Sequence, residues 1–177
     1  MYVIITNMKI QIIGYSGAGK STLAEQLAKH YKINHLYMDS VQFYGDFKSR
    51  SIEEQNALVR DFLSKNDNWV IDGNYYSVAP ERYNLCDEIY FLDYPRLFCL
   101  KEALKRYFKN RNQFRESLGC VENFDFSFFM WIIYEGRTKY WKQQHELHFN
   151  KCLNRHRFKS RKELLKYLED NKLISSK

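Results

Sequence analysis

The sequence contains few residues that break a chain and no apolar run long enough to cross a membrane. Its 177 residues include only two prolines and seven glycines, and no run approaches the roughly 18 to 20 apolar residues of a membrane-spanning helix. The short apolar stretch at residues 2–6 has no basic residue before it and no cleavage site after it. A hydrophobic share of 45% excludes a disordered chain. We therefore expect one cytoplasmic globular domain, with no membrane contact.

The four cysteines do not form a metal-binding or redox motif. Cys86, Cys99, Cys120 and Cys152 are 13, 21 and 32 residues apart, so the sequence has no CxxC pair. Structural zinc sites and thiol–disulfide centres usually contain such a pair. We expect packed, reduced thiols.

Charge is distributed unevenly between the two halves of the chain. Residues 1–95 carry 9 Lys and Arg against 12 Asp and Glu, whereas residues 96–177 carry 19 against 9. The net charges are therefore −3 and +10. A basic half suits a polyphosphate, a nucleic acid or a solvated surface, and charge alone does not choose among them.

The hydrophobic pattern alternates between short strands and longer helices. Lys9–Ile13 is a short apolar run before a glycine-bearing turn, and apolar residues then recur at helical spacing as far as Tyr31. Such alternation implies parallel crossovers, so we predict an α/β three-layer fold with a five-stranded parallel sheet and helices on both faces. The other strands are predicted at residues 36–38, 69–71, 88–92 and, interrupted by charge, 152–158.

Two capping boxes and one proline indicate where helices begin. Ser51 with Glu54, and Ser160 with Glu163, have the spacing of an N-cap residue and its N3 partner. Pro95 suits the first turn of a helix that is predicted to end near residue 108.

A further helix is predicted over residues 126–145. Its aromatic face, which we interpret as core and not as a cofactor site, comprises Phe128, Trp131, Ile132, Tyr134 and Trp141.

Residues 14–21 read GYSGAGKS and match the phosphate-binding motif GxxxxGK[ST] at every fixed position. The motif lies between a predicted strand and a predicted helix, which is the context that it requires. Lys20 should bridge the β- and γ-phosphates of ATP, the Ser21 hydroxyl should ligate Mg²⁺, and Thr22 should reach the α-phosphate. The predicted nucleotide-binding residues are Gly14, Ser16, Gly17, Ala18, Gly19, Lys20, Ser21 and Thr22.

Three aspartates follow predicted strands at the edge where parallel sheets bind ligands. They are Asp39, Asp72 and Asp93. Asp72 follows three apolar residues, where P-loop enzymes commonly place a carboxylate that holds Mg²⁺. The alternative is an aspartate that caps a turn. Asn74 and Tyr75 extend either role, and we include both as substrate-binding candidates.

The P-loop near the N-terminus and Asp-Gly after the third strand resemble the small kinases of adenylate kinase architecture. More closely, residues 12–22 (IIGYSGAGKST), 38–40 (MDS), 69–75 (WVIDGNY) and 134–138 (YEGRT) resemble the bacterial DNA topology modulation proteins. The similarity runs from about residue 8 to the final helix. Residues 1–7 have no counterpart in it, and we expect an irregular extension or an edge strand there.

The resemblance implies an ATP-binding protein that is built like a phosphotransferase, without supplying an acceptor. In related small-molecule kinases, the position of Asp39 holds an acceptor hydroxyl or a metal-bound water. Asp39 could also be an ordinary turn residue. Arg50 and Arg82, after the second and third strands, are candidates for binding an acceptor phosphate.

Residues 106–125 are predicted to form a helical, basic lid that closes over the phosphates. The catalytic candidates in and near this segment are Arg106, Arg111, Arg115 and Arg137. An arginine can offset the charge that develops on the transferred phosphoryl group. The alternative for each is a solvated helix end.

Three functions fit this sequence. The first is a Mg²⁺-dependent kinase that transfers phosphate from ATP to an unidentified small molecule of nucleotide or nucleoside type. The second is a nucleotide-dependent regulator or DNA-associated ATPase, whose basic half contacts the DNA backbone, although no helix-turn-helix or zinc-finger spacing supports direct reading of bases. The third is a nucleotide-binding fold without catalysis, which the intact set of Lys20, Ser21 and Asp72 disfavours.

Overall fold

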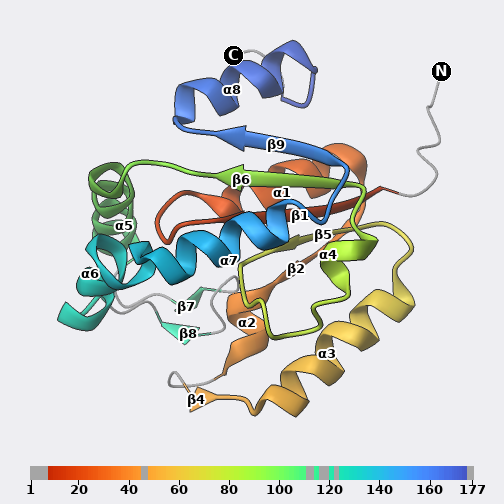
Figure 1. The fold of residues 1–177 in the computed structure, drawn as a ribbon, viewed down its shortest axis with the longest axis horizontal. Helices are drawn as coiled ribbons and strands as arrows, with labels where there is room; N and C mark the ends of the chain where they lie inside the picture. Colours follow the sequence, from red (N-terminus) through yellow and green to blue (C-terminus); the bar gives the residue numbers. More distant parts are fainter. Residues whose placement is uncertain (1–7, 45–47, 111–113, 116–119, 122–123, 175–177) are drawn as a thin grey trace.

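The computed structural model describes residues 8–44, 48–110 and 124–174, and the backbone of residues 114–115 and 120–121. The predicted N-terminal extension, residues 1–7, lies outside the described part. The core is a five-stranded parallel sheet in the order β2-β5-β1-β6-β9 (Figure 1), which confirms the predicted sheet. Its strands are β1 (Lys9–Gly14), β2 (Asn34–Tyr37), β5 (Trp69–Asp72), β6 (Glu88–Leu92) and β9 (Asn154–Phe158).

Burial explains why one strand was harder to predict than the others. Every residue of β5 is buried, as are the last five of β1, and both strands are accordingly apolar. Strand β9 lies at the edge of the sheet, and four of its five residues are exposed or half-buried. An edge strand tolerates charged side chains, which is why NRHRF pairs with β6 despite its charge.

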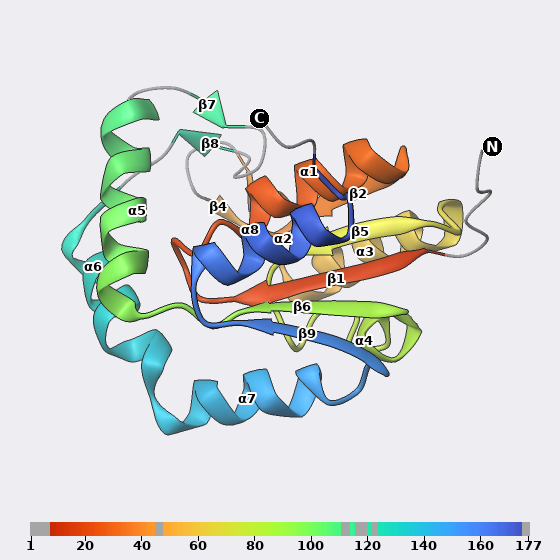
Figure 2. The same ribbon diagram turned by 90° about the horizontal axis from the view of Figure 1, so that it is seen from above.

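Helices cover both faces of the sheet. Figure 2 shows α1 and α8 on one face and α7 on the other, with α5 beyond the carboxyl ends of the strands. No helix in the described part of the chain is long and apolar enough to cross a membrane. The helices are α1 (Lys20–Tyr31), α2 (Met38–Gln42), α3 (Ile52–Lys65), α4 (Arg82–Leu85), α5 (Arg96–Asn110), α6 (Phe126–Ile133), the 3₁₀ turn η1 (Glu135–Arg137), α7 (Lys139–Phe149) and α8 (Arg161–Asp170).

Two short antiparallel pairs complete the described elements. Strand β3 (Phe43–Tyr44) pairs with β4 (Lys48–Ser49), and β7 (Phe114–Arg115) pairs with β8 (Cys120–Val121). The second pair lies within the predicted lid. The described backbone there is therefore extended and not helical after residue 110.

The first predicted capping box is confirmed and the second is half formed. The Ser51 hydroxyl accepts from the Glu54 backbone N–H at 3.2 Å, and the Glu54 carboxylate accepts from the Ser51 N–H at 2.8 Å. The Ser160 hydroxyl likewise accepts from the Glu163 N–H. The Glu163 carboxylate instead accepts from the N–H of Lys159, one residue before the cap.

The single helix predicted over 126–145 is wrong, because the chain breaks at Tyr134 into α6, η1 and α7. The break brings Gly136 against α6, where an added Cβ would lie 2.9 Å from the Trp131 carbonyl oxygen. Of the predicted aromatic and apolar face, Ile132 is buried but Tyr134 is 64% exposed.

Candidate active site

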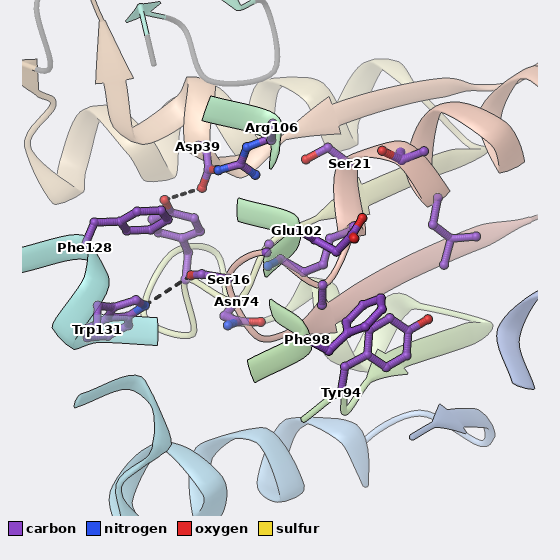
Figure 3. A pocket seen from close by; sticks show the side chains of 18 of the residues that line it. Ser16, Ser21, Asp39, Asn74, Tyr94, Phe98, Glu102, Arg106, Phe128 and Trp131 are labelled. Carbon is purple, nitrogen blue, oxygen red and sulfur yellow. Dashed lines mark hydrogen bonds between the residues drawn. The ribbon is translucent and has the colours of Figure 1, made fainter. Parts of the chain in front are cut away.

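A cavity of about 1410 Å³ lies at the carboxyl ends of the strands. The predicted phosphate loop forms its floor, since residues 16–22 all line it. Helices α2, α5, α6, α7 and α8 and the loop after β5 supply the walls. Figure 3 shows a close view in which Asp39, Arg106 and Phe128 gather at one side and Tyr94 and Phe98 lie at another.

Two glycines shape the phosphate loop for different reasons. Gly17 has φ of +81°, and an added Cβ would lie 2.2 Å from the carbonyl oxygen of Cys99, so α5 packs directly against the loop. Gly19 has φ of +91° with open space around it, so its requirement is conformational alone. Gly19 precedes α1 without a side-chain cap. The first N–H groups of α1 are thus left to bind an anion.

Asn74 fixes the start of the phosphate loop. Its amide accepts from the Gly14 N–H and donates to the Gly14 carbonyl, both at 3.0 Å. The next residue back, Gly73, donates its N–H to the Ile12 carbonyl. Asn74 also lines the cavity, where the sequence predicted a substrate contact. Its side chain is nevertheless largely committed to holding the loop.

Lys20, Ser21 and Asp72 form a polar group beneath the loop. The Ser21 hydroxyl donates to Oδ2 of Asp72 at 2.7 Å, and the Lys20 ammonium donates to the Tyr15 carbonyl at 3.2 Å. Burial lowers the pKa of Lys20, against the attraction of Asp39 and Asp72. Burial also raises the pKa of Asp72 to about 7, with repulsion from Asp39 adding to the shift.

The Ser21–Asp72 pair fits a magnesium ion. Oδ1 of Asp72 is buried, and it has no hydrogen-bond partner among the described residues. A buried carboxylate oxygen without a partner is costly unless a cation or water satisfies it. The described residues contain no cluster of three or more metal-ligating side chains. One hydroxyl and one carboxylate therefore suit Mg²⁺, which usually keeps several waters and takes other ligands from nucleotide phosphates.

If Ser21 and Asp72 hold Mg²⁺, the affinity for this ion should fall as Asp72 takes up a proton. With a pKa of about 7, the ionised fraction drops from roughly nine-tenths at pH 8 to one-tenth at pH 6, and we expect about tenfold weaker Mg²⁺ binding. Isothermal titration of the ATP-loaded protein with Mg²⁺ at both pH values measures this change. Asp72→Asn is the control. Protonation of the nucleotide affects Mg²⁺ binding equally in both proteins, but residue 72 titrates only in the wild type. Equal pH dependence in the wild type and Asp72→Asn would contradict the prediction.

Asp39 lines the cavity from the first turn of α2, two residues after the end of β2. The sequence placed it at the tip of the strand, but β2 ends at Tyr37 and the helix begins at Met38. The Tyr75 hydroxyl donates to Oδ1 of Asp39 at 2.6 Å. Burial, then the charge of Asp39, raises the pKa of Tyr75 well above its usual range, so the phenol keeps its proton. Figure 3 shows the Arg106 side chain reaching toward Asp39 from α5.

Arg82 does not face the cavity, so its prediction as an acceptor-phosphate ligand is wrong. The side chain is 0% exposed and its donors are used inside the protein. Nε donates to Oε1 of Gln11 at 3.1 Å. The other two nitrogens donate to the carbonyls of Val78, Ala79, Asn74 and Tyr75 and to the Tyr83 hydroxyl.

Arg50, which was also predicted to bind an acceptor phosphate, makes hydrogen bonds within the protein instead. Its Nη1 donates to the carbonyls of Ser40, Val41 and Phe43 at 2.9 to 3.0 Å, which ties the end of α2 to the chain that follows. Arg50 does not line the cavity. Its hydrogen bonds hold the C-terminal end of α2, the helix that carries Asp39.

Arg137, predicted as a catalytic residue, does not line the cavity and instead packs against Tyr15 of the phosphate loop. Its guanidinium lies 3.3 Å from the centroid of the Tyr15 ring and donates to the Tyr94 carbonyl and the Cys99 sulfur. Arg106 lines the cavity as predicted. Arg111 lies outside the described residues, and for Arg115 only the backbone of β7 is described.

Sequence reasoning missed the aromatic lining of the cavity. Phe128, Trp131 and Trp141, which were expected in the core, are half-buried and line it instead. The Trp131 indole N–H donates to the Ser16 hydroxyl at 3.2 Å, which fixes the ring beside the phosphate loop. Tyr94 and Phe98 line another part. Tyr94 lies two residues beyond the end of β6. This position after a strand could have indicated that Tyr94 lines the site, because ligands bind at the carboxyl ends of the strands.

The comparisons with known proteins agree with this geometry. No protein-family model matches the chain. The uncharacterized protein YqaC of Bacillus subtilis (strain 168) is 31% identical over 101 residues, which are 56% of this chain and 57% of that protein. An adenylate kinase of Clostridium botulinum (strain Eklund 17B / Type B) is 30% identical over 111 residues, 60% of this chain and 49% of the enzyme. The chain thus matches about half the length of these curated relatives.

A solved structure shows the fold over nearly the whole chain. Shikimate kinase from Acinetobacter baumannii, in complex with shikimate, superposes with a TM-score of 0.51 at 15% identity, covering 96% of this chain and 97% of the kinase. The names of these relatives do not confirm the DNA topology modulation family, so that resemblance remains a prediction. The chain is similar to P-loop kinases, and it has the three-layer P-loop NTPase fold.

Proposed function

We propose that the protein is a Mg²⁺-dependent kinase that transfers the γ-phosphoryl group of ATP to a hydroxyl of a small molecule. The observation that carries this proposal is the arrangement around Lys20. Asp39 faces the cavity nearby, and the Ser21–Asp72 pair leaves one buried carboxylate oxygen without a partner. Similarity to an adenylate kinase supports it.

The phosphate loop would bind the triphosphate of ATP. Residues 17–22 line the cavity where the phosphates would lie, and they include the N-terminus of α1, which has no side-chain cap. The Lys20 ammonium would exchange its present bond to the Tyr15 carbonyl for phosphate oxygens. Ser21 and Asp72 would hold Mg²⁺, which when bound offsets charge on the phosphate oxygens.

Asp39 would orient the acceptor. The Tyr75 hydroxyl occupies Oδ1 at 2.6 Å, which fixes the carboxylate and leaves Oδ2 for the acceptor. A carboxylate in this place can accept the hydroxyl proton as the new bond to phosphorus forms. Arg106, which reaches toward the same place, would offset charge on the transferred group.

The direction of ATP in the cavity follows from this arrangement. Because the γ-phosphate must lie near Asp39, the adenosine must extend away from it. Tyr94 and Phe98 line the cavity on that other side, together with residues of α8. Aromatic faces there suit a nucleobase.

The test is ADP release from Mg-ATP, measured without an acceptor and then with nucleosides, nucleoside monophosphates, sugars, hydroxy acids and duplex DNA. We expect one small molecule to stimulate release, and Asp39→Asn to lower the stimulated rate about 10²-fold, because general base catalysis typically contributes 10²- to 10⁴-fold. The matched control is Asp93→Asn, since Asp93 follows β6 but does not line the cavity.

Two results would count against the proposal. Full stimulated activity in Asp39→Asn would remove Asp39 from the acceptor site. Stimulation by duplex DNA alone would instead favour a DNA-associated ATPase.

A further inference from the structure

His145 is a buried imidazole behind the phosphate loop that the proposed reaction does not use. The residue is 2% exposed and lies on α7, the helix that covers one face of the sheet (Figure 2). It does not line the large cavity, so it is not placed to touch a nucleotide or an acceptor there. Its partners nevertheless belong to the phosphate loop and to the segment that holds the loop. Any effect of His145 on the reaction must therefore pass through these neighbours.

The hydrogen bonds of His145 determine which ring nitrogen carries the proton. Nδ1 lies 2.6 Å from the carbonyl oxygen of Trp141, and a carbonyl only accepts, so Nδ1 is the donor. Burial lowers the pKa of His145 to about 4, and the charges of Lys20 and Arg137 add to the shift. The ring is therefore neutral near pH 7. Its other nitrogen, Nε2, has no proton and acts as an acceptor.

The partner of Nε2 is Asn74, whose amide fixes Gly14. Nδ2 of Asn74 lies 3.4 Å from Nε2 of His145 and 3.0 Å from the Gly14 carbonyl oxygen, so its two hydrogens serve both acceptors. The Asn74 side-chain oxygen accepts from the Gly14 N–H. If the amide were turned over, its oxygen would face two acceptors and its nitrogen would face an N–H. His145 thus stabilises the amide orientation that pairs Asn74 with Gly14.

His145 also contacts the residue that follows Gly14. Its ring stacks on Tyr15, with centroids 4.9 Å apart and an angle of 24° between the planes. The Tyr15 carbonyl accepts from the Lys20 ammonium, so the backbone of Tyr15 lies next to the group that would bind phosphate. The imidazole therefore holds two consecutive residues of the loop, Gly14 through Asn74 and Tyr15 by stacking.

We propose that His145 is a positioning residue of the phosphate loop, and that it acts by accepting a hydrogen bond from Asn74 at Nε2. This inference rests on the proposed binding of ATP at the loop. When the amide is fixed, the loop has fewer conformations to lose as it binds the phosphates, which raises its affinity for ATP. Without the acceptor, Asn74 can turn and release Gly14. Part of the binding energy is then used to order the loop.

Two substitutions separate the role of Nε2 from the packing of the ring. In His145→Gln the side-chain amide reaches the position of Nε2 and keeps an acceptor there, whereas in His145→Asn it ends at the position of Nδ1. Both variants lose the ring, so both should lower the melting temperature of the nucleotide-free protein. Calorimetry on the full chain measures binding of a non-hydrolysable ATP analogue with Mg²⁺. We expect about tenfold weaker binding in His145→Asn, and binding within about threefold of the wild type in His145→Gln.

A double-mutant cycle tests the path through Asn74. If Nε2 acts on the loop through this amide, His145→Asn should weaken ATP binding less than about twofold in the Asn74→Ala background. A tenfold loss in both backgrounds would show that His145 acts by another route, and would overturn the inference.

The matched control is His156→Asn. The His156 ring packs against Tyr90 and Tyr167, with centroids 4.8 and 4.9 Å apart, and does not line the cavity. This variant should lower the melting temperature and leave ATP affinity unchanged. Equal weakening of ATP binding in His156→Asn and His145→Asn would overturn the inference, because a loss of stability would then explain both results.

Nitrogen-15 spectra of the imidazole test the tautomer directly. We expect the neutral ring of His145 to carry its proton on Nδ1 at pH 7. A ring protonated on Nε2 would overturn the inference, since that nitrogen would donate and could not accept from Asn74.

The outcomes distinguish this inference from the proposed function. Equal ATP affinity in His145→Gln and His145→Asn would overturn the inference, whether both variants bound normally or both bound weakly. In that case, stimulated ADP release that depends on Lys20 would still establish a kinase. If the wild type did not bind ATP, the inference and the proposed function would both fall.

Discussion

Lys20→Ala should lower phosphoryl transfer about 10³-fold. Lys20 lies near both carboxylates of the site, as the attraction of Asp39 and Asp72 on its pKa indicates. Its ammonium would stabilise the charge that moves toward the β–γ bridging oxygen, and loss of one such donor costs about 10²- to 10³-fold in rate. The rate is measured as ADP release from Mg-ATP with a saturating acceptor.

The stability of the Lys20→Ala variant makes this result interpretable. Burial lowers the pKa of Lys20, so the charged form is less favourable in the folded than in the unfolded chain. Removing it should therefore not lower the melting temperature of the nucleotide-free protein. A loss of activity without a loss of stability would locate the effect in the site.

The matched control for Lys20 lies on the same helix. Lys29 is exposed in the last turn of α1, and Lys29→Ala should leave the rate unchanged. Lys20→Arg should also be impaired, since a planar guanidinium does not fit a place shaped for an ammonium. A transfer rate in Lys20→Ala within threefold of the wild type would show that the phosphate loop does not take part in the reaction.

The floor of the site could be predicted because its residues are close together in the sequence. Glycines and a lysine at fixed spacing, between an apolar strand and an apolar helix, determine the loop locally. Asp72 could be predicted in the same way, from three apolar residues followed by Asp-Gly. The register that pairs Ile12 with Asp72 then brings the loop and the carboxylate together.

The walls of the site could not be predicted, because they depend on tertiary contacts. Trp131 has the spacing of a core residue, and only the break at Tyr134 and the bond to Ser16, 115 residues away, place it on the cavity. Periodicity indicates which face of a helix is apolar but not whether that face meets core or cavity. The same limit explains why aromatic residues were interpreted as core.

The arginines illustrate a second limit. From the sequence alone, Arg50 and Arg82 follow strands at the edge where ligands bind, which favours a binding role. In the structure, backbone carbonyls of neighbouring turns accept their hydrogen bonds. A carbonyl that needs a donor has no sequence signature, since every residue carries one. Only the fold shows which carbonyls lie within reach of an arginine side chain.

Arg82→Met should destabilise the protein by about 3 to 5 kcal/mol. Two effects oppose each other. Removing a fully buried guanidinium relieves the free-energy cost of taking its charge out of water. The same cost lowers the pKa of Arg82. The substitution also removes the donor to Oε1 of Gln11 and to the Val78 carbonyl, at roughly 1 to 3 kcal/mol for each oxygen left without a partner. The second effect is larger, although the carbonyls of Asn74, Tyr75 and Ala79 keep other donors, namely the Tyr83 hydroxyl and the N–H groups of residues 78 and 82.

The expected fall in melting temperature is about 6 to 20 °C, since 1 kcal/mol corresponds to roughly 2 to 4 °C in a chain of this size. Arg60→Met is the matched control. Arg60 forms an exposed ion pair with Glu81 at 2.7 Å, and such surface pairs contribute about 0 to 1 kcal/mol. Urea unfolding of both variants measures the difference in their free energies of unfolding.

The same experiment tests whether Arg82 holds the loop at residues 74–79 in place. If Arg82 holds the loop at residues 74–79, Arg82→Met lowers stability and also loosens Asn74, whose amide fixes Gly14. ATP affinity should then fall together with stability, and Arg82→Lys should not restore either, because one ammonium cannot reach oxygens on both sides of the turn. Normal stability and normal ATP affinity in Arg82→Met would contradict this structural role.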